Sequence, residues 1–248
     1  MDFLTWTYYF RRITRNPLYY EIEHTDHGSI QKYLVELIDK TVFELEGSGC
    51  IKIEDEFKLQ PTFTGSIASL YYIRHQTVKF FNSKLKAGLS IYELLTVMSG
   101  CGEYDEVPVR HNEEALNEAL ANICPYKINR QKLDDPKTKT LLLFQAYFSN
   151  LPLPIRDYIT DTKLVLDNCI RLLQAMIDMA TDKGYLDTVL NLCQLSQMVA
   201  QGCWVNESGL LNIPHFSEEL IKKLATEDGI KYLCQILKVH KAGCLRSY

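Results

Sequence analysis

The chain has 248 residues, of which 46% are apolar, and this composition supports a packed core and argues against wholesale disorder. Its net charge of -4 argues against a protein whose main task is to clamp phosphate, because such proteins are usually basic. No apolar run approaches the roughly 18 residues of a membrane span, and residues 1–6 lack the basic stretch of a signal peptide.

Residues 1–60 have the pattern of a small helix followed by a hairpin. One helical face carries the apolar residues Ile30, Leu34, Leu37, Ile38, Val42 and Leu45. Ser29 is the expected N-cap, and Gly47 and Gly49 are expected to end the helix. Apolar and polar residues then alternate over 51–59, which predicts a half-buried hairpin that turns at 54–56. A helix that leads into a two-stranded wing is typical of the end of a winged helix.

Residues 61–204 are predicted to form a helical bundle. One helix is expected to begin at Thr64 or Gly65 and to continue to Leu85. A capping box at 90–93 is expected to open the next helix, and another helix is expected to start near Asn112. Asp135 as N-cap with Pro136 predicts a helix that ends near Phe148. A long helix is predicted over 161–182, ended by Gly184, and a further helix over 186–201.

Residues 205–248 are predicted to contain two short helices. Ser217 is expected to cap the first, residues 226–229 to form the turn, and 230–237 to form the second. A glycine-rich hairpin between two helices can bind a phosphate through its N–H groups, but this turn carries Glu227 and Asp228. Two carboxylates repel phosphate, so a packing module is favoured here over a nucleic-acid contact.

The sequence contains none of the motifs that bind nucleotides or catalyse hydrolysis. There is no G-x-x-x-x-G-K-[ST] phosphate loop, no G-x-G-x-x-G turn and no D-E-x-H box. Glu21, Glu23, His24 and His27 lack the spacing of a metal site, so a solvated acidic turn is favoured. We therefore expect no catalytic residue, no metal and no cofactor.

The eight cysteines form no C-x-x-C pair, which is typical of reduced thiols in the cytosol or the nucleus. Several lie within apolar helical stripes, Cys169 and Cys193 among them, and we expect these to be buried core thiols. Charge is also uneven along the chain, since residues 1–57 hold six Lys or Arg and eleven Asp or Glu. A winged helix that reads DNA is normally basic, so this part is interpreted as a structural connector.

The long predicted helix over 161–182 carries one narrow polar stripe, whereas most of its other residues are apolar. The stripe consists of Asp167, Arg171, Gln174, Asp178 and Thr181. One interpretation is an ordinary solvated face. The other is the lining of a single-strand channel, in which Arg171 contacts phosphate or stacks on a base and Gln174 donates hydrogen bonds. A strand-facing Arg171 predicts that Arg171→Ala leaves stability nearly unchanged, whereas a buried Arg171 paired with Asp167 predicts a large loss.

Several short motifs in this chain resemble the accessory region of Ski-two-like helicases. The winged-helix segment of that family is similar to TWTYYFRR at 5–12 and NPLYY at 16–20. Its Sec-63 homology domain is similar to GSIASLYY at 65–72, EY at 103–104, PVRHNE at 108–113, LLL at 141–143, TDTK at 160–163 and QGCW at 201–204. The resemblance covers about residues 2–237 and is nearest to the second, C-terminal cassette of tandem family members.

The resemblance implies a mainly α fold with three parts. These are a winged-helix remnant with a small β-hairpin over 1–60, a Sec-63-type bundle over 61–204 and a partial helix-loop-helix domain over 205–248. In the family, two RecA-like motor domains precede the winged helix, and neither is recognisable here. The family's long ratchet helix lies across the translocating strand, and residues 161–182 hold that place in the order. By this resemblance Arg171 and Gln174, and less strongly Arg110, are candidate strand contacts.

The implied function is therefore that of a non-motor accessory region within an ATP-dependent 3′-to-5′ helicase. The resemblance places such a parent in DNA repair, transcription coactivation or ribosome quality control, in the nucleus and the cytoplasm. The expected partners are the parent's motor domains, single-stranded DNA or RNA, and protein subunits of a larger complex. The alternative is a docking platform for proteins that binds no nucleic acid, which the net negative charge favours.

Overall fold

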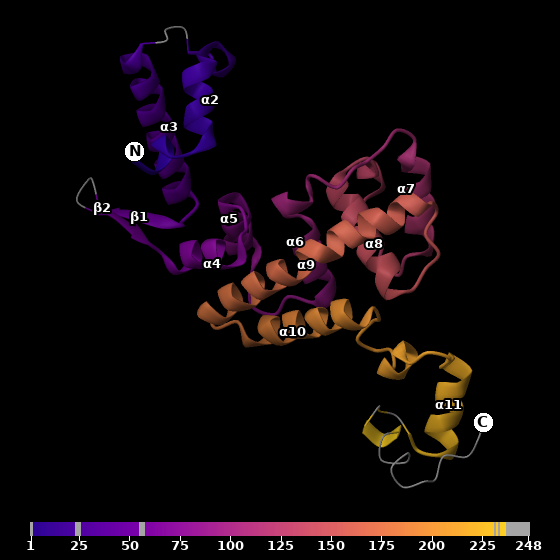
Figure 1. Cartoon of the computed structure of the whole chain (residues 1–248). Coiled ribbons are helices and arrows are strands. Elements are labelled where there is room, and N and C mark those ends of the chain that lie inside the picture. Colours follow the sequence, from indigo (N-terminus) through magenta and orange to yellow (C-terminus); the bar gives the residue numbers. More distant parts are fainter. Residues whose placement is uncertain (1, 23–25, 55–57, 231, 233, 237–248) are drawn as a thin grey trace. The chain divides into compact units, whose positions relative to one another are not determined.

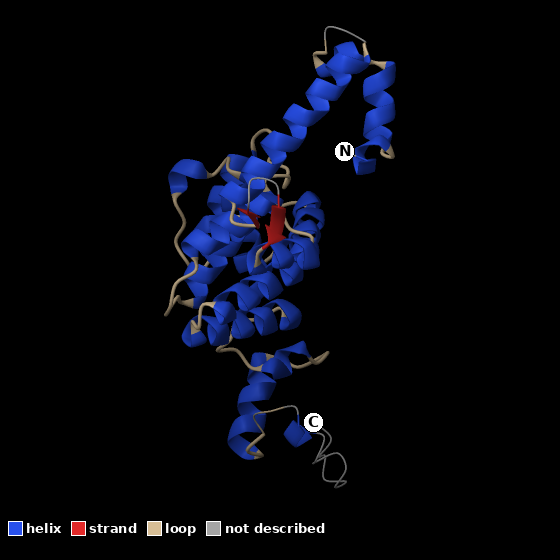
Figure 2. Cartoon of the chain, turned by 90° about the vertical axis from the view of Figure 1, so that its left-hand side faces the viewer, coloured by secondary structure: helices blue, strands red, loops and turns tan. Residues whose placement is uncertain are grey.

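The computed structural model describes residues 2–22, 26–54, 58–230, 232 and 234–236. Helices dominate, and the described strands form one two-stranded antiparallel sheet (Figure 2). The predicted mainly α fold with a small hairpin is confirmed. Within the described part, no helix has both the length and the apolar character that a membrane crossing requires.

The chain forms two compact units, Met1–Leu70 and Tyr71–Tyr248. The first contains α1 (Asp2–Thr5), α2 (Tyr8–Arg15), the 3-10 helix η1 (Pro17–Tyr20), α3 (His27–Gly47), β1 (Ile51–Glu54), β2 (Lys58–Pro61) and nearly all of α4 (Phe63–Tyr71). The predicted division at residues 60 and 204 stays a proposal, and residues 61–70 cluster with the first unit.

The second unit is a bundle built around α9. It contains α5 (His75–Lys84), α6 (Ile91–Ser99), η2 (Gly102–Tyr104), α7 (Glu113–Ile123), η3 (Arg130–Lys132), α8 (Pro136–Phe148), α9 (Arg156–Asp182), α10 (Leu186–Gln201), η4 (Gly209–Asn212) and α11 (Glu218–Glu227). Four helices of the unit, α5, α6, α8 and α10, pack against α9 (Figure 1). Its central position explains why α9 buries apolar residues along its whole length, from Tyr158 to Met179.

A small apolar core holds the first unit together. Its buried members are Ile13, Ile22, Ile30 and Leu34. The Tyr9 and Tyr33 hydroxyls are joined by a hydrogen bond of 2.9 Å beside this core. The expected N-cap of α3 was wrong, because Asp26 caps this helix and Ser29, three residues later, donates its backbone N–H to the Asp26 carboxylate. An aspartate ahead of a serine competes for the cap, and the ionised acceptor makes the stronger bond.

The hairpin pairs Ile53 with Leu59 and Glu54 with Lys58, which confirms that the two strands are antiparallel neighbours. Of the turn predicted at 54–56, Glu54 is the last residue of β1 and the other two residues lie outside the described part of the chain. The expectation of a half-buried hairpin was wrong for Ile53 and Leu59, since both side chains are exposed. Alternation fixes which residues share a face of the sheet but does not say whether another element covers that face. Phe57, also counted on this face, lies outside the described residues.

The helix predicted from residue 64 to 85 is two helices, α4 and α5. The break lies at Tyr72, whose φ of 57° is left-handed. The long helix also begins earlier than predicted, at Arg156, directly after the Pro154–Ile155 segment. By contrast, the predicted bounds of α10, the capping box of Ser90 and Glu93 and the Asp135 cap of α8 are all confirmed.

Other local expectations had mixed outcomes. Ser217 caps α11 as predicted, whereas the second helix expected at 230–237 falls partly outside the described residues.

Cys169 is buried, and burial raises the pKa of its thiol to about 12. Cys193 is exposed, so its assignment to the core was wrong; it lies on the outer side of α10. Of the suspected acidic turn, Glu23 and His24 lie outside the described residues, and no cluster of metal-binding side chains occurs in the described part.

Candidate nucleic-acid interface

The α9 helix has a buried face and an outer face, and the predicted polar stripe lies on the outer one. Val165, Cys169, Leu172 and Met176 are among its buried residues. Asp167, Gln174 and Thr181 are exposed, and Arg171 and Asp178 are half-buried. Two apolar residues of α9, Leu164 and Ile170, are exposed as well. The outer face of α9 is therefore a mixed polar and apolar surface.

The Arg171 guanidinium is held by neutral acceptors. It donates one hydrogen bond to the main-chain carbonyl of Tyr72 and a second, of 2.6 Å, to Oδ1 of Asn168. No carboxylate of the described residues lies within ion-pair distance, and the pairing with Asp167 considered from sequence is not formed. Arg171 thus keeps an uncompensated positive charge at a partly exposed position on the outer face.

The same face fastens the turn between α4 and α5 at a second point. The hydroxyl of Tyr71 donates a hydrogen bond of 2.6 Å to the Asp178 carboxylate. This bond, ahead of burial, raises the pKa of Tyr71 above its usual value. Asp178 therefore accepts a hydrogen bond from a neutral donor, and its carboxylate lies about two helical turns from Arg171 on α9.

Gln174 lies between these two anchors, three residues after Arg171 and four before Asp178. Its side chain is exposed and makes no hydrogen bond to any described residue. A free carboxamide offers two donors and one acceptor to an incoming ligand. The structure thus brings Arg171 and Gln174 together on one face, as the sequence predicted.

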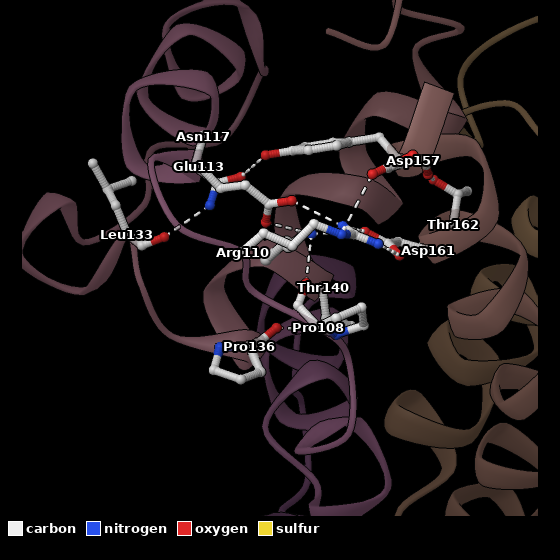
Figure 3. A network of polar contacts seen from close by, with 12 residues as sticks. Pro108, Arg110, Glu113, Asn117, Leu133, Pro136, Thr140, Asp157, Asp161 and Thr162 are labelled. Atoms are coloured by element: carbon white, nitrogen blue, oxygen red, sulfur yellow. Dashed lines mark hydrogen bonds and ion pairs between the residues drawn. The ribbon is translucent and has the colours of Figure 1, made fainter. Parts of the chain in front are cut away.

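Arg110 occupies a different place and a different environment (Figure 3). It donates two hydrogen bonds to Asp161, of 2.8 and 3.1 Å, and one of 2.9 Å to Glu113. Asp157 lies 3.4 Å from its Nε. These bonds, to Asp161 first and then Glu113, raise the pKa of Arg110. Asp161 precedes Arg171 by ten residues of α9, which is about 15 Å along the helix axis.

A buried lysine completes this polar network. Lys139 of α8 is fully buried, and its ammonium group donates bonds of 2.7 Å to Asp161, to Glu113 and to the Pro108 carbonyl. The ring of Tyr158 lies under the same ammonium, 4.5 Å from it. Every proton of the lysine thus has an acceptor, which is the condition under which a buried charge is tolerated.

The two buried carboxyls stay ionised within this network. Burial alone would raise the pKa of Glu113 and of Asp161. The hydrogen bonds from Lys139 and Arg110 outweigh burial, and the pKa of each carboxyl lies below its usual value. Two cations thus face two anions where α7, α8 and the start of α9 meet.

The sequence did not predict this network or the Tyr72 turn. The signal for the network is the presence of Lys139 and Thr140 at the start of a run that is otherwise apolar to Phe144, although this does not identify the partners. The sequence gives even less indication of the turn at Tyr72, because no glycine or proline marks the break between the two helices. Both features depend on residues far apart in sequence.

Comparison with known proteins gives two family matches. The Sec63 Brl domain family matches residues 61–240, and a winged helix-turn-helix domain family matches residues 1–55. The winged-helix and Sec-63 resemblance inferred from the sequence is confirmed by these matches.

Similar proteins occur in animals and plants. The chain is 48% identical to human activating signal cointegrator 1 complex subunit 3, over 87% of the chain and 10% of that protein. It is 45% identical to a DExH-box ATP-dependent RNA helicase of Arabidopsis thaliana and 38% identical to the human U5 small nuclear ribonucleoprotein 200 kDa helicase, over 96% of the chain and 11% of each relative. The chain thus spans about a tenth of the length of these relatives.

Proposed function

The chain belongs to the Sec63 Brl domain family, and from this membership we propose that it is a non-motor accessory part of an ATP-dependent nucleic-acid helicase. Its task is to guide a single strand past the outer face of α9. The observation that supports this most directly is the uncompensated charge of Arg171 beside the free carboxamide of Gln174.

The chemistry of these two side chains suits a single strand. A guanidinium offers a planar cation that stacks on a base or bridges two phosphate oxygens. The carboxamide of Gln174 adds hydrogen bonds to a base edge or to the backbone. Arg110 is the weaker candidate, because Asp161, Glu113 and Asp157 already hold its guanidinium, and a phosphate would have to displace one of them.

The relatives' names support the wider setting. Two are called helicases, and others are a subunit of the activating signal cointegrator 1 complex, which agrees with a role in transcription coactivation. We extend this to a parent that acts in DNA repair, transcription coactivation or ribosome quality control, in the nucleus and the cytoplasm. Its partners are the parent's motor domains and protein subunits of the complex. The chain itself supplies no phosphate loop and hydrolyses no nucleotide.

A protein-docking platform is the second candidate, and exposed aromatic residues of the first unit favour it. Phe3, Trp6 and Tyr8 are exposed, Trp6 to 88%. Large aromatic side chains on a surface are typical anchors of protein interfaces. This function needs no strand contact on α9, so the two candidates make different predictions.

Binding of a labelled single strand at low and at high salt tests the proposal. We expect weak binding that falls as salt rises, because a cation that contacts phosphate releases counterions. Arg171→Ala should weaken binding by roughly 1–3 kcal/mol if the guanidinium stacks on a base, and Gln174→Ala by about 1 kcal/mol. Leu186→Ala, an exposed position on α10, is the matched control and should change nothing. Absence of binding at low salt would leave the docking platform as the function.

A further inference from the structure

Tyr72 is held in an unusual position at the turn between α4 and α5. Its φ of 57° lies in the left-handed region, where residues with a side chain are uncommon. Its side chain is 88% exposed. A strained backbone that displays a large aromatic ring to solvent is a combination that packing does not explain, and such outliers cluster at ligand-binding sites.

The ring contributes nothing visible to the fold. Its two neighbours make the structural contacts: Tyr71 bonds to Asp178, and Ile73 is buried. Among the described residues, Tyr72 has no aromatic or cation-π partner, and its hydroxyl forms no hydrogen bond. Residues on either side therefore fix the turn, while the ring between them stays free.

Two residues of the outer face of α9 bond to this turn. Arg171 donates to the carbonyl of Tyr72 itself, and Asp178 accepts from Tyr71, the residue before it. The backbone of Tyr72 is thus within hydrogen-bond distance of the guanidinium whose charge no carboxylate neutralises. An aromatic platform and a cation are the two groups that single-strand binding sites combine.

We propose that Tyr72 is a further nucleic-acid contact, on whose ring one base of a single strand stacks while Arg171 binds the adjacent phosphate. The inference rests on the proposed strand-guiding function and adds a residue to it. Stacking tolerates any base, because every base has a flat π-face, so this contact suits a strand that moves past it regardless of sequence. The bond from Arg171 holds the platform in place.

Four variants of the whole chain distinguish the contribution of the Tyr72 ring to binding from the contribution of the turn to the fold. Tyr72→Asn and Tyr72→Gly remove the ring but accept a left-handed backbone, so the fold should survive. Tyr72→Trp keeps a stacking surface. Gln174→Ala probes the strand path without touching the turn. Fluorescence anisotropy with labelled oligothymidylate and oligouridylate measures the affinity, and thermal unfolding measures the fold.

We expect Tyr72→Asn and Tyr72→Gly to raise Kd roughly 5- to 150-fold, the range of one stacked base. Both should keep or raise the melting temperature, since the strain is relieved. Tyr72→Trp should bind at least as well as the wild type, and its fluorescence should be quenched by the strand more than that of the wild type. A ring that only supports the fold would instead lower the melting temperature and leave Kd unchanged.

The outcomes distinguish the inference from the function on which it rests. If the wild type binds and Gln174→Ala weakens binding while Tyr72→Asn and Tyr72→Gly bind like the wild type, Tyr72 is no contact and the strand path stands. If the wild type binds neither oligonucleotide, the strand-guiding function falls and the Tyr72 contact falls with it.

Discussion

The ammonium group of Lys139 lies 2.7 Å from Oδ2 of Asp161, and both side chains are buried. Removing the cation leaves the two buried carboxylates with Arg110 as their remaining cation, and breaking a buried ion pair typically lowers the free energy of unfolding by about 3–5 kcal/mol. We expect Lys139→Met to show a loss of this size in urea denaturation. Lys137→Met is the matched control on α8, because Lys137 makes only an exposed pair with Asp105 and should contribute at most about 1 kcal/mol. Equal effects of the two substitutions would contradict the structural role of the network.

The same network predicts how stability depends on pH. The folded pKa values of Glu113 and Asp161 are depressed below their usual 4.5 and 3.8. A depressed pKa means that the unfolded chain binds protons first, so this stabilisation is present above the usual pKa and is lost as pH falls through the folded value. We expect the contribution of these two carboxyls to the free energy of unfolding to be constant near neutral pH and to decrease below about pH 4.5.

Asp26 and Glu93 also have lowered pKa values, so they contribute to the same loss of stability at acid pH. The effect of the network is therefore measured as the difference in pH dependence between the wild type and Lys139→Met. Without Lys139 each of the two buried carboxyls loses one of its donors, so the loss of stability at acid pH should become shallower in Lys139→Met. Identical slopes for the wild type and this variant would show that the network does not set the pH dependence.

Arg171 and Gln174 should differ in their effect on stability. Arg171→Ala removes the bond to the Tyr72 carbonyl, and we expect a loss of about 1–2 kcal/mol, because that carbonyl can turn to water. The structure thus revises the expectation from sequence that Arg171→Ala leaves stability unchanged. Gln174→Ala should stay within about 0.5 kcal/mol of the wild type. Thermal unfolding checks both, and faster amide exchange at residues 72–75 should accompany only Arg171→Ala.

Local signals predicted those elements whose ends are set by neighbouring residues. The bounds of α10, the Ser90 capping box and the Asp135–Pro136 start of α8 all depend on residues within one helical turn. The break at Tyr72 was missed because the side chain that bonds to it there, Arg171, lies 99 residues away in the sequence. Apolar spacing continues through this break, so periodicity alone favoured one helix.

The candidate site could be predicted only in part for the same reason. The polar stripe follows from helical spacing within α9, so Arg171 and Gln174 were found together. Burial of Lys139 and the carboxylate partners of Arg110 depend on how α7, α8 and α9 pack, which spacing does not encode. A lysine is also rarely buried, so its position gave no reason to place it in a core.

Gly65 is required where the hairpin joins α4. A Cβ atom at this position would lie 1.9 Å from the main-chain carbonyl oxygen of Cys50, and a backbone oxygen cannot rotate away. The Cys50 carbonyl also accepts a hydrogen bond of 3.1 Å from Thr62, which fixes it further. Gly65→Ala therefore forces Cys50, the residue before β1, and the start of α4 apart. We expect a loss of about 3 kcal/mol in the free energy of unfolding of the first unit, the upper end for overpacking.

Gly47→Ala is the matched control for this substitution. Gly47 is the last residue of α3, and a Cβ there would meet no described atom within 4 Å. Alanine favours the helix by up to about 1 kcal/mol over glycine, so Gly47→Ala should be neutral or slightly stabilising. Urea denaturation followed by circular dichroism compares the two variants, and amide exchange at Cys50 and Thr62 locates the change. If Gly65→Ala is as stable as Gly47→Ala, the close approach between Cys50 and α4 does not exist in solution.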